Sequence, residues 1–366
     1  MSEPQQSKKI RLTLAPEAER YVRRDGPVEV RRMAARGALP LAPVDLATVL
    51  FALLHDPDDE TKSRARDSLE ALPKPLVATV LSSPAHPALL SYLGRVHKDD
   101  GDLLEKLALN AAAEDATMVW LAAQPHKRVV EIVAQNQQRL LRCPDIVEAL
   151  GSNPLTGRSV IDRILSFLGI EKAAGEEAEP GEERLPPFEQ TEITDAAALQ
   201  ALRAILGDDM DGFARELIEE REGELDPEAQ GSLYALIQTL SVFQKVKLAR
   251  NGNKEARALL VRDRNKIVAT AAIRSPKISE NEVEGFAKAR NISDEVLRII
   301  AGNRDWTKGY GVKMNLVMNP RCPQATAMRF LNYLQDKDLR AIMRSKDVPS
   351  AISTHARRIL TKKGKL

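Results

Sequence analysis

The sequence predicts an all-α protein in which short helices stack into an α-α superhelix, arranged as two related arrays joined by an acidic linker. A helix-end pattern that recurs along the chain and an unusual composition lead to this prediction. Hydrophobic residues make up 43% of the chain, but aromatic residues only 4%. Leu, Val, Ile and Ala therefore carry the burial, whereas strands of a large mixed sheet are enriched in β-branched and aromatic residues.

The recurring pattern is an apolar residue, three variable residues, two apolar or small residues, one further residue and then Asn or Ser, often followed by Pro. Apolar residues four positions apart lie on one face of a helix. Asn tolerates the left-handed conformation that ends many helices, Pro cannot continue one, and Asn or Ser can also cap the next helix. The pattern therefore predicts helix ends at Ser83, Asn110, Asn136 and Asn153, and again at Asn251, Ser275, Asn303 and Asn319.

The spacing of these stops predicts an internal duplication. In both series two long steps are followed by one short step, from Asn136 to Asn153 in the first and from Asn303 to Asn319 in the second. The helix that follows each series has apolar residues at matching positions, from Ile161 to Leu168 and from Ala327 to Leu334. The offset between these two helices equals the offset between Asn153 and Asn319. A repeat this short cannot bury its own apolar face, so neighbouring repeats have to stack.

Charge and composition divide the chain into segments. Residues 171–231 carry 5 basic and 19 acidic side chains, a balance of −14, and residues 232–366 carry 27 and 11, a balance of +16. A Pro- and Gly-containing acidic stretch with few large apolar residues is typical of a flexible linker. The predicted order is a charged N-terminal arm (1–40), a first helical array (41–170), an acidic flexible linker (171–195), an acidic helical segment (196–227), a second, basic helical array (228–360) and a basic tail (361–366).

The sequence resembles known repeat families. The Asn-Pro and Ser-Pro junctions, the Leu/Val/Ala helices and the repeat length are similar to the leucine-rich-repeat-variant and HEAT-like α-solenoids of bacteria. The stretches 129–142 and 252–268 also resemble an uncharacterised bacterial family with such repeats. The resemblance covers about 45–170 and 235–360 and implies the architecture, but it implies no activity.

No motif typical of an active site is present. The sequence lacks GxxxxGK[ST], GxGxxG between a strand and a helix, and GxSxG, and its five histidines show no HExxH spacing. The acidic clusters, such as the one at 56–60, fit helix starts and solvated faces. We therefore expect no catalysis, no cofactor and no metal. An enzyme function remains as an alternative through the likeness to HEAT-like DNA glycosylases, which rests on fold alone.

The N-terminus has no apolar signal-peptide core, and no stretch reaches the roughly 18 to 20 apolar residues that span a bilayer. The two cysteines, Cys143 and Cys322, are too few for a disulfide framework and are expected to be small buried side chains. The sequence thus predicts a cytoplasmic protein without membrane insertion.

The basic second array is the strongest functional signal. Its charges could bind a polyanion such as nucleic acid, an acidic partner protein, or the chain's own acidic residues 171–228, which would then contact the basic region 244–346. Trp306 between two cations is either a packing residue or a recognition anchor. The candidate binding surface consists of Arg257, Arg262, Arg264, Lys266, Arg274, Lys277, Arg304, Trp306 and Lys308.

The function that fits best is a non-catalytic scaffold or adaptor that binds partner proteins on an extended helical surface. The alternative is nucleic-acid binding by the second array, autoinhibited by the acidic residues 171–228. Few aromatic residues interleave with the basic ones, which disfavours single-strand binding.

Overall fold

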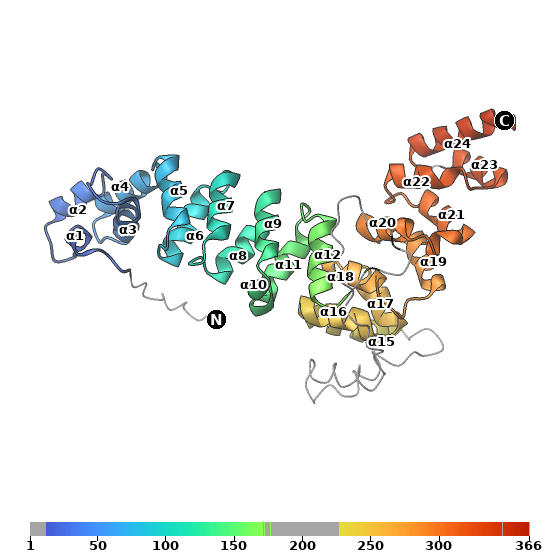
Figure 1. Ribbon diagram of the computed structural model, residues 1–366, viewed down its shortest axis with the longest axis horizontal. Helices are drawn as coiled ribbons and strands as arrows, with labels where there is room; N and C mark the ends of the chain where they lie inside the picture. Colours follow the sequence, from blue (N-terminus) through green and yellow to red (C-terminus); the bar gives the residue numbers. More distant parts are fainter. Residues whose placement is uncertain (1–11, 171, 173–175, 177–226, 346, 366) are drawn as a thin grey trace. The chain divides into compact units, whose positions relative to one another are not determined.

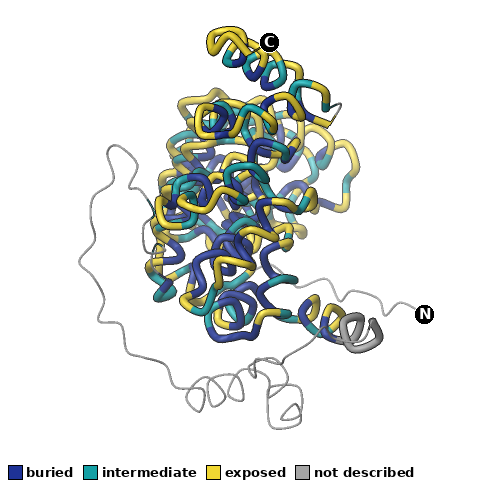
Figure 2. Tube along the Cα trace, turned by 90° about the vertical axis from the view of Figure 1, so that its right-hand side faces the viewer, coloured by how far each residue is buried: buried dark blue, intermediate teal, exposed yellow. Residues whose placement is uncertain are grey.

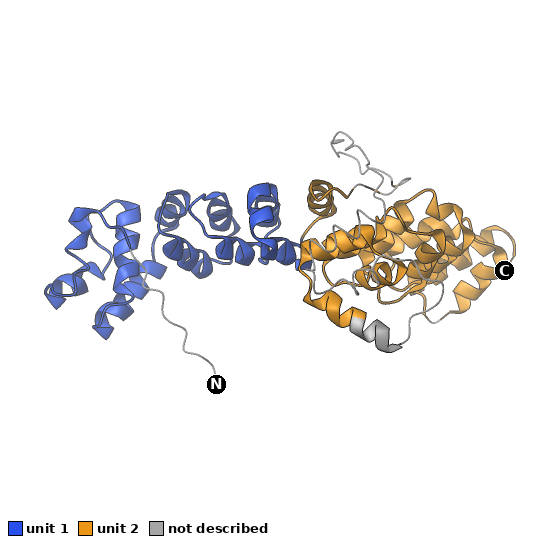
Figure 3. Cartoon of the chain, turned by 90° about the horizontal axis from the view of Figure 1, so that it is seen from below, with its two compact units in different colours: residues 1–155 blue, residues 156–366 orange. Residues whose placement is uncertain are grey.

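The computed structural model describes residues 12–170, 172, 176, 227–345 and 347–365 (Figure 1). Every regular element within these ranges is helical, which confirms the predicted all-α fold. None of the described helices combines the length and the apolar character needed to cross a bilayer. The chain divides into two compact units, residues 1–155 and 156–366 (Figure 3). The predicted acidic helix lies outside the described residues, as does most of the predicted linker.

Unit 1 is a succession of short helices. In order, they are α1 (Pro16–Glu19), α2 (Val28–Ala34), α3 (Pro43–Leu53), α4 (Asp59–Glu70), α5 (Lys74–Ser82), α6 (Pro87–Val96), α7 (Gly101–Leu109), α8 (Asp115–Ala122), α9 (Lys127–Gln135), α10 (Gln137–Arg142) and α11 (Pro144–Ser152).

Unit 2 opens with α12 (Arg158–Phe167) and resumes beyond the acidic residues. Its further elements are α15 (Pro227–Thr239), α16 (Val242–Asn251), α17 (Lys254–Leu260), α18 (Lys266–Ile273), α19 (Glu280–Lys288), α20 (Asp294–Gly302), the 3₁₀ turn η2 (Trp306–Lys308), α21 (Tyr310–Met318), α22 (Gln324–Leu331), α23 (Asp336–Arg344) and α24 (Ser350–Lys362).

Polar side chains begin many of these helices. Asp58 caps α4 by accepting from the Thr61 amide at 3.0 Å, so the acidic cluster at 56–60 is a helix start, as expected. Ser241 and Ser279 open α16 and α19 as capping boxes, in which the side chain three residues later reaches back to the cap amide. These caps satisfy backbone donors that have no partner within the helix.

The recurring stops occupy helix ends. Ser83, Asn110, Asn136, Asn153, Asn303 and Asn319 are C-caps, while Asn251 is the last residue of α16 and Ser275 follows the C-cap of α18. The expected left-handed conformation is wrong, because only glycines have positive φ among the described residues. Most of the capping asparagines are extended, as in Asn110 with φ −76° and ψ 119°.

The asparagine amides explain why an extended cap is used. Asn153 donates to the carbonyls of Ala122 and Gln124, at 2.7 and 2.9 Å, and accepts from the Leu155 amide at 2.9 Å. Asn319, its counterpart in the second series, makes the same three contacts to Ala287, Ala289 and Arg321. Each of these stops therefore ties its own helix to the end of an earlier helix, because an extended backbone aims the side chain sideways.

Helix packing explains why two long steps between the recurring stops are followed by a short one. Helices α3, α5, α7 and α9 pack each on the next, as do α16, α18 and α20, whereas α8 packs on α11 and α19 on α21. The long steps from Ser83 to Asn136 and from Asn251 to Asn303 thus follow one row of helices. The short steps to Asn153 and Asn319 move to the other row.

Buried positions recur along the helices of both units (Figure 2). In α7 the buried side chains are Leu103, Leu104 and Leu107, and in α20 they include Val296, Leu297 and Ile300. The positions i, i+1 and i+4 share one face of a helix. Helices such as α7 and α20 therefore contribute one apolar stripe to the core of their unit, whereas α18 is buried at every position from Ile267 to Ile273.

The unit boundary differs from the predicted array boundary. The units separate between Leu155 and Thr156 rather than at 170, because α12 packs on α18 of the second unit. The acidic residues 171–226 consequently begin after α12 and end before α15, both in unit 2. The expectation that they link the two arrays is therefore not met by these units.

The charged N-terminal arm contains helix α2, and Arg31 is buried within this helix. The guanidinium donates to Asp56 Oδ2 at 2.8 Å and to the Gly26 carbonyl at 2.6 Å. A buried charge is tolerated only when it is paired in this way, so residues from α2 onward are anchored to unit 1.

Candidate functional site

The structure separates the nine residues of the predicted basic surface into three groups. Arg257 and Arg274 are buried, with 1% and 4% of their surface exposed. Arg262, Arg264 and Lys266 lie at the turn between α17 and α18. The remaining four lie beyond the carboxyl ends of α18 and α20, and they are Lys277, Arg304, Trp306 and Lys308.

Arg257 does not belong to a surface, which corrects its assignment as a binding residue. Its Nε and Nη2 donate to the two oxygens of Glu282 at 2.9 and 3.0 Å, and Nη1 donates to the Gly252 carbonyl at 2.9 Å. Burial raises the pKa of Glu282, but the hydrogen bonds from Arg257 and Ser279 outweigh burial and hold this pKa below its ordinary value. The pair joins α17 to α19 within unit 2.

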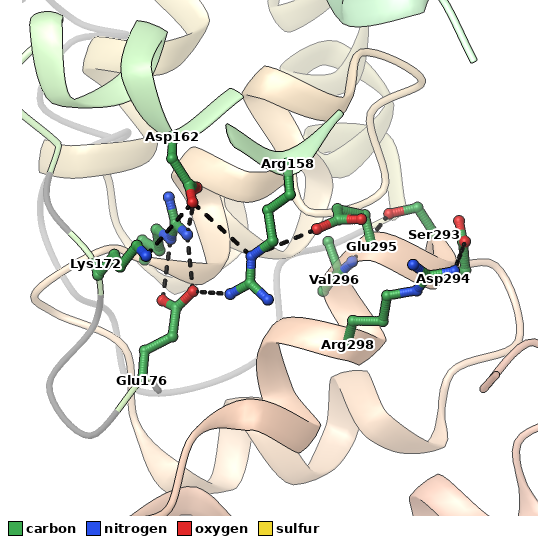
Figure 4. Close-up of polar contacts among 10 residues, drawn as sticks. Arg158, Asp162, Lys172, Glu176, Ser293, Asp294, Glu295, Val296 and Arg298 are labelled. Atoms are coloured by element: carbon green, nitrogen blue, oxygen red, sulfur yellow. Dashed lines mark hydrogen bonds and ion pairs between the residues drawn. The ribbon is translucent and has the colours of Figure 1, made fainter. Parts of the chain in front are cut away.

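Arg274 is also internal, and it lies in a group of six charged side chains that we call the charged cluster. Figure 4 labels the other five members of this cluster. Helix α12 supplies two of these side chains, the chain just beyond it two more, the end of α18 one and the start of α20 one. In chain order the members are Arg158, Asp162, Lys172, Glu176, Arg274 and Glu295.

Glu176 is held most completely within the charged cluster. Arg274 donates to it from Nε at 3.1 Å and from Nη2 at 2.8 Å, and Arg158 Nη2 donates to Oε1. The Glu176 side chain has no exposed surface, and its backbone forms an isolated antiparallel bridge with Asn303. A two-point fork between guanidinium and carboxylate is among the strongest polar contacts in proteins. One contact between acidic residues 171–228 and the basic region 244–346 therefore exists, as expected.

The other two carboxylates of the cluster are less well satisfied. Asp162 Oδ1 lies 2.7 Å from Arg274 Nη2, yet neither Asp162 oxygen has a hydrogen bond of good geometry. Glu295 Oε1 faces Arg158 Nε at 3.8 Å and also lacks a hydrogen bond. These contacts are ion pairs without a fork, and a buried carboxylate in that situation keeps part of its desolvation cost.

The pKa shifts agree with the poorer pairing of Asp162 and Glu295. Burial raises the pKa of Asp162, and the opposing charge of Arg274 does not cancel that effect. Burial likewise raises the pKa of Glu295 against the opposing charges of Arg158 and Arg298. Arg274 shows the reverse balance, because its burial is outweighed by Glu176 and Asp162, which raise its pKa. The Arg274–Glu176 fork is therefore the stable part of the charged cluster.

The remaining candidates lie at opposite ends of two parallel helices. Arg262 donates to Asn291 Oδ1 at 3.3 Å, which brings the starts of α18 and α20 together, while Glu176 contacts both Arg274 and Asn303 at their ends. Arg262, Arg264 and Lys266 therefore lie near the amino-terminal ends of these helices, and Lys277, Arg304, Trp306 and Lys308 lie beyond their carboxyl ends. The nine residues do not form a single patch.

Sequence reasoning missed Arg158, Asp162, Glu176 and Glu295. A signal for two of them was present in the duplication. At the offset that relates Asn153 to Asn319, Arg158 corresponds to Gln324 and Asp162 to Met328, so a charge stands where the later helix has a neutral residue. The signal is stronger for Asp162, because its counterpart Met328 is apolar and a charge at such a position predicts a buried partner.

No group of three or more His, Cys, Asp or Glu side chains suited to a metal ion occurs within the described ranges. Cys322 is buried, and burial raises the pKa of its thiol to about 12, whereas Cys143 is half-buried. The comparisons found no family model, curated protein or solved structure that matches the chain.

Proposed function

We propose that the chain is a non-catalytic scaffold or adaptor, an α-α superhelix of two related helical-repeat arrays that binds partner proteins. The observation that carries this proposal is the asparagine contact shared by Asn153 and Asn319, which ties helix ends together in the same way in both halves. Repeat proteins built from such stacked units present long surfaces that are suited to partners.

The order of elements supports a duplication. Helix α11 and helix α21 each contain 9 residues and begin at Pro144 and Tyr310, the same offset that relates Asn153 to Asn319. Helix α9 and helix α20 also have 9 residues each and begin at Lys127 and Asp294. The short α10 between α9 and α11 has η2 as its counterpart between α20 and α21.

The turn between α17 and α18 is the best candidate for a partner contact. Arg262 and Arg264 are exposed, and Lys266 is half-buried at the first position of α18. Arg257 and Arg274 are enclosed by their carboxylate partners. The accessible basic side chains between 257 and 274 therefore lie at this turn. Interfaces commonly use Arg side chains as anchors.

The test is an affinity capture with mass spectrometry from the native cell. The bait is the full chain, compared with a variant in which Arg262, Arg264 and Lys266 are changed to Gln. A matched control changes three exposed cations elsewhere in unit 2, Lys288, Lys337 and Arg344, to Gln. The proposal predicts a partner that the turn variant loses and the control retains. Turnover by the purified chain in a broad hydrolase or transferase screen would disprove a non-catalytic role.

The alternative, nucleic-acid binding, is favoured by the same turn. Binding through phosphates weakens steeply with salt, with a slope of about 0.9 per contacted phosphate on duplex DNA. A mobility shift at about 50 and 200 mM salt should then show a shallower slope for the turn variant than for the control. If no shift occurs at about 50 mM salt, nucleic-acid binding is excluded.

A further inference from the structure

The chain inserts one of its own carboxylates between a buried cation, Arg274, and a partly buried one, Arg158. Glu176 lies shortly after the end of α12, and its side chain is enclosed by Arg158 from α12 and Arg274 from α18. The Arg274 side chain is 1% exposed and that of Arg158 14%. Two guanidiniums that converge on one carboxylate form a receptor of defined shape, because the planar fork of Arg matches a carboxylate at two points.

A second carboxylate lies beside the first. Asp162 Oδ1 is 2.7 Å from Arg274 Nη2, the atom that also donates to Glu176 at 2.8 Å. Glu176 has the fork geometry and Asp162 does not. If Glu176 left, a small rotation would let Asp162 take over the Arg274 contact, so the cation would not remain buried and unpaired. The charged cluster thus has the parts of a two-state element.

We propose that Arg158 and Arg274 form a carboxylate receptor, that Glu176 occupies it as a tethered latch, and that an acidic peptide of a partner protein replaces Glu176. This inference rests on the proposed partner-binding function and names the chemistry of one partner. An acidic peptide fits because the site already holds a Glu side chain that comes from the strongly acidic segment of this chain.

The tether explains why the latch is closed in the free chain. A short connection gives an attached group an effective concentration in the millimolar range. Glu176 therefore outcompetes a free peptide unless the partner makes further contacts elsewhere on the surface. Opening the receptor would also separate the Glu176 backbone from Asn303.

The first experiment measures hydrogen exchange of the full chain at the amide of Glu176, whose backbone pairs with Asn303. Glu176→Gln removes the charge-assisted hydrogen bonds and should speed exchange about tenfold or more, since such bonds contribute roughly 1.5–3 kcal/mol. Asp162→Asn removes the competitor and should slow exchange. If Asp162 instead only stabilised the closed cluster, Asp162→Asn would speed exchange. Asp294→Asn is the control, because Asp294 lies next to Glu295 but is exposed, and it should change nothing.

The second experiment adds a fluorescent peptide of residues 171–186 to the full chain and follows its anisotropy. Glu176→Gln empties the receptor and should bind the peptide about tenfold more tightly than the wild type does. The same peptide carrying Gln at position 176 should not bind. This peptide arm needs no change to either arginine, so misfolding of an Arg274 variant cannot obscure the result.

The outcomes separate the latch from the proposed function. Unchanged exchange in Glu176→Gln, or equal binding of both peptides, overturns the latch, even if affinity capture still yields a partner at the α17–α18 turn. Selective peptide binding supports the receptor even if that turn proves to contact nothing.

Discussion

The single asparagine at the end of a helix illustrates how one side chain can determine the arrangement of two elements. The Asn319 amide donates at 2.8 and 3.0 Å to two carbonyls near the end of α19, and its oxygen accepts from the Arg321 amide. Asn319 is 2% exposed, so water cannot replace these bonds. The side chain therefore satisfies backbone groups on two segments that are distant in the sequence.

Asn319→Asp tests this role at the residue scale. The change keeps the size and the acceptor but puts a carboxylate against the carbonyls of Ala287 and Ala289. We expect the free energy of unfolding to fall by about 1–3 kcal/mol, the cost of buried polar groups left without partners. Urea unfolding measures it. Asn332→Asp, at an exposed helix end, is the control and should cost less than about 1 kcal/mol.

Glu295 gives a pH prediction at the same scale. Its pKa lies above the ordinary 4.5, chiefly because of burial. Between the unfolded and the folded pKa the folded chain binds more protons, so the contribution of Glu295 to stability falls as pH rises. Glu295→Gln removes this ionisation. The variant should gain stability relative to the wild type as pH rises from about 4.5 towards neutrality.

The measurement is a urea midpoint series between about pH 4 and 8, compared with Glu280→Gln as the exposed control. The raised pKa of Glu295 would be contradicted if the stability difference between Glu295→Gln and the wild type stayed constant across the series. It would also be contradicted if this difference fell with rising pH.

Glu282 should show the opposite dependence of stability on pH. Its pKa is lowered, so the stability it contributes is lost as pH falls through its folded pKa.

At the scale of the element, two glycines should respond to the same substitution with opposite signs. A Cβ on Gly252, between α16 and α17, would lie 2.6 Å from the Leu248 carbonyl oxygen and 3.0 Å from Ala256 Cβ. A Cβ on Gly285, inside α19, meets nothing within 4 Å. Gly252→Ala should therefore destabilise the chain by about 1–3 kcal/mol, and Gly285→Ala should stabilise it by about 0.5–1 kcal/mol.

Thermal unfolding followed by circular dichroism compares the two glycine variants. A shift of the midpoint in the same direction for both would show that close packing at the α16–α17 junction is not what requires Gly252. Both substitutions add the same methyl group, so a difference between the two variants reflects the surroundings of each glycine.

The elements were the most predictable level. Apolar spacing and the Asn or Ser stops placed helix ends correctly, since both depend on local sequence. The sequence did not predict that the short steps to Asn153 and Asn319 move to the other row of helices, because this depends on which helices pack together. The burial of Arg257 and Arg274 was missed for a related reason. Their carboxylate partners lie 25 and 98 residues away, and charge composition alone does not reveal such pairs.

At the scale of the molecule, the boundary at Leu155–Thr156 can be tested with fragments. Fragment 156–366 keeps α12 and the charged cluster and should unfold cooperatively. Fragment 171–366 lacks α12, so α18 loses one of its packing partners and Arg274 loses Asp162. It should be less stable by several kcal/mol, because α12 buries Val160, Ile161, Ile164 and Leu165, each worth about 1.5–3 kcal/mol.

Urea unfolding of the two fragments provides the measurement. Equal stability would mean that α12 belongs with the first unit, as the composition of the chain predicted. Acidic composition predicted a flexible linker, but it could not show which unit holds the helices on either side of those residues.

The position of residues 171–226 has an evolutionary consequence. Since the stretch leaves and re-enters the same unit, it is an insertion rather than a spacer. In general, doubling the length of a flexible loop costs only about 0.6 kcal/mol in closure entropy. Homologous chains could therefore lengthen, shorten or rewrite it while the helices on either side keep their register, provided that a carboxylate remains at the place of Glu176.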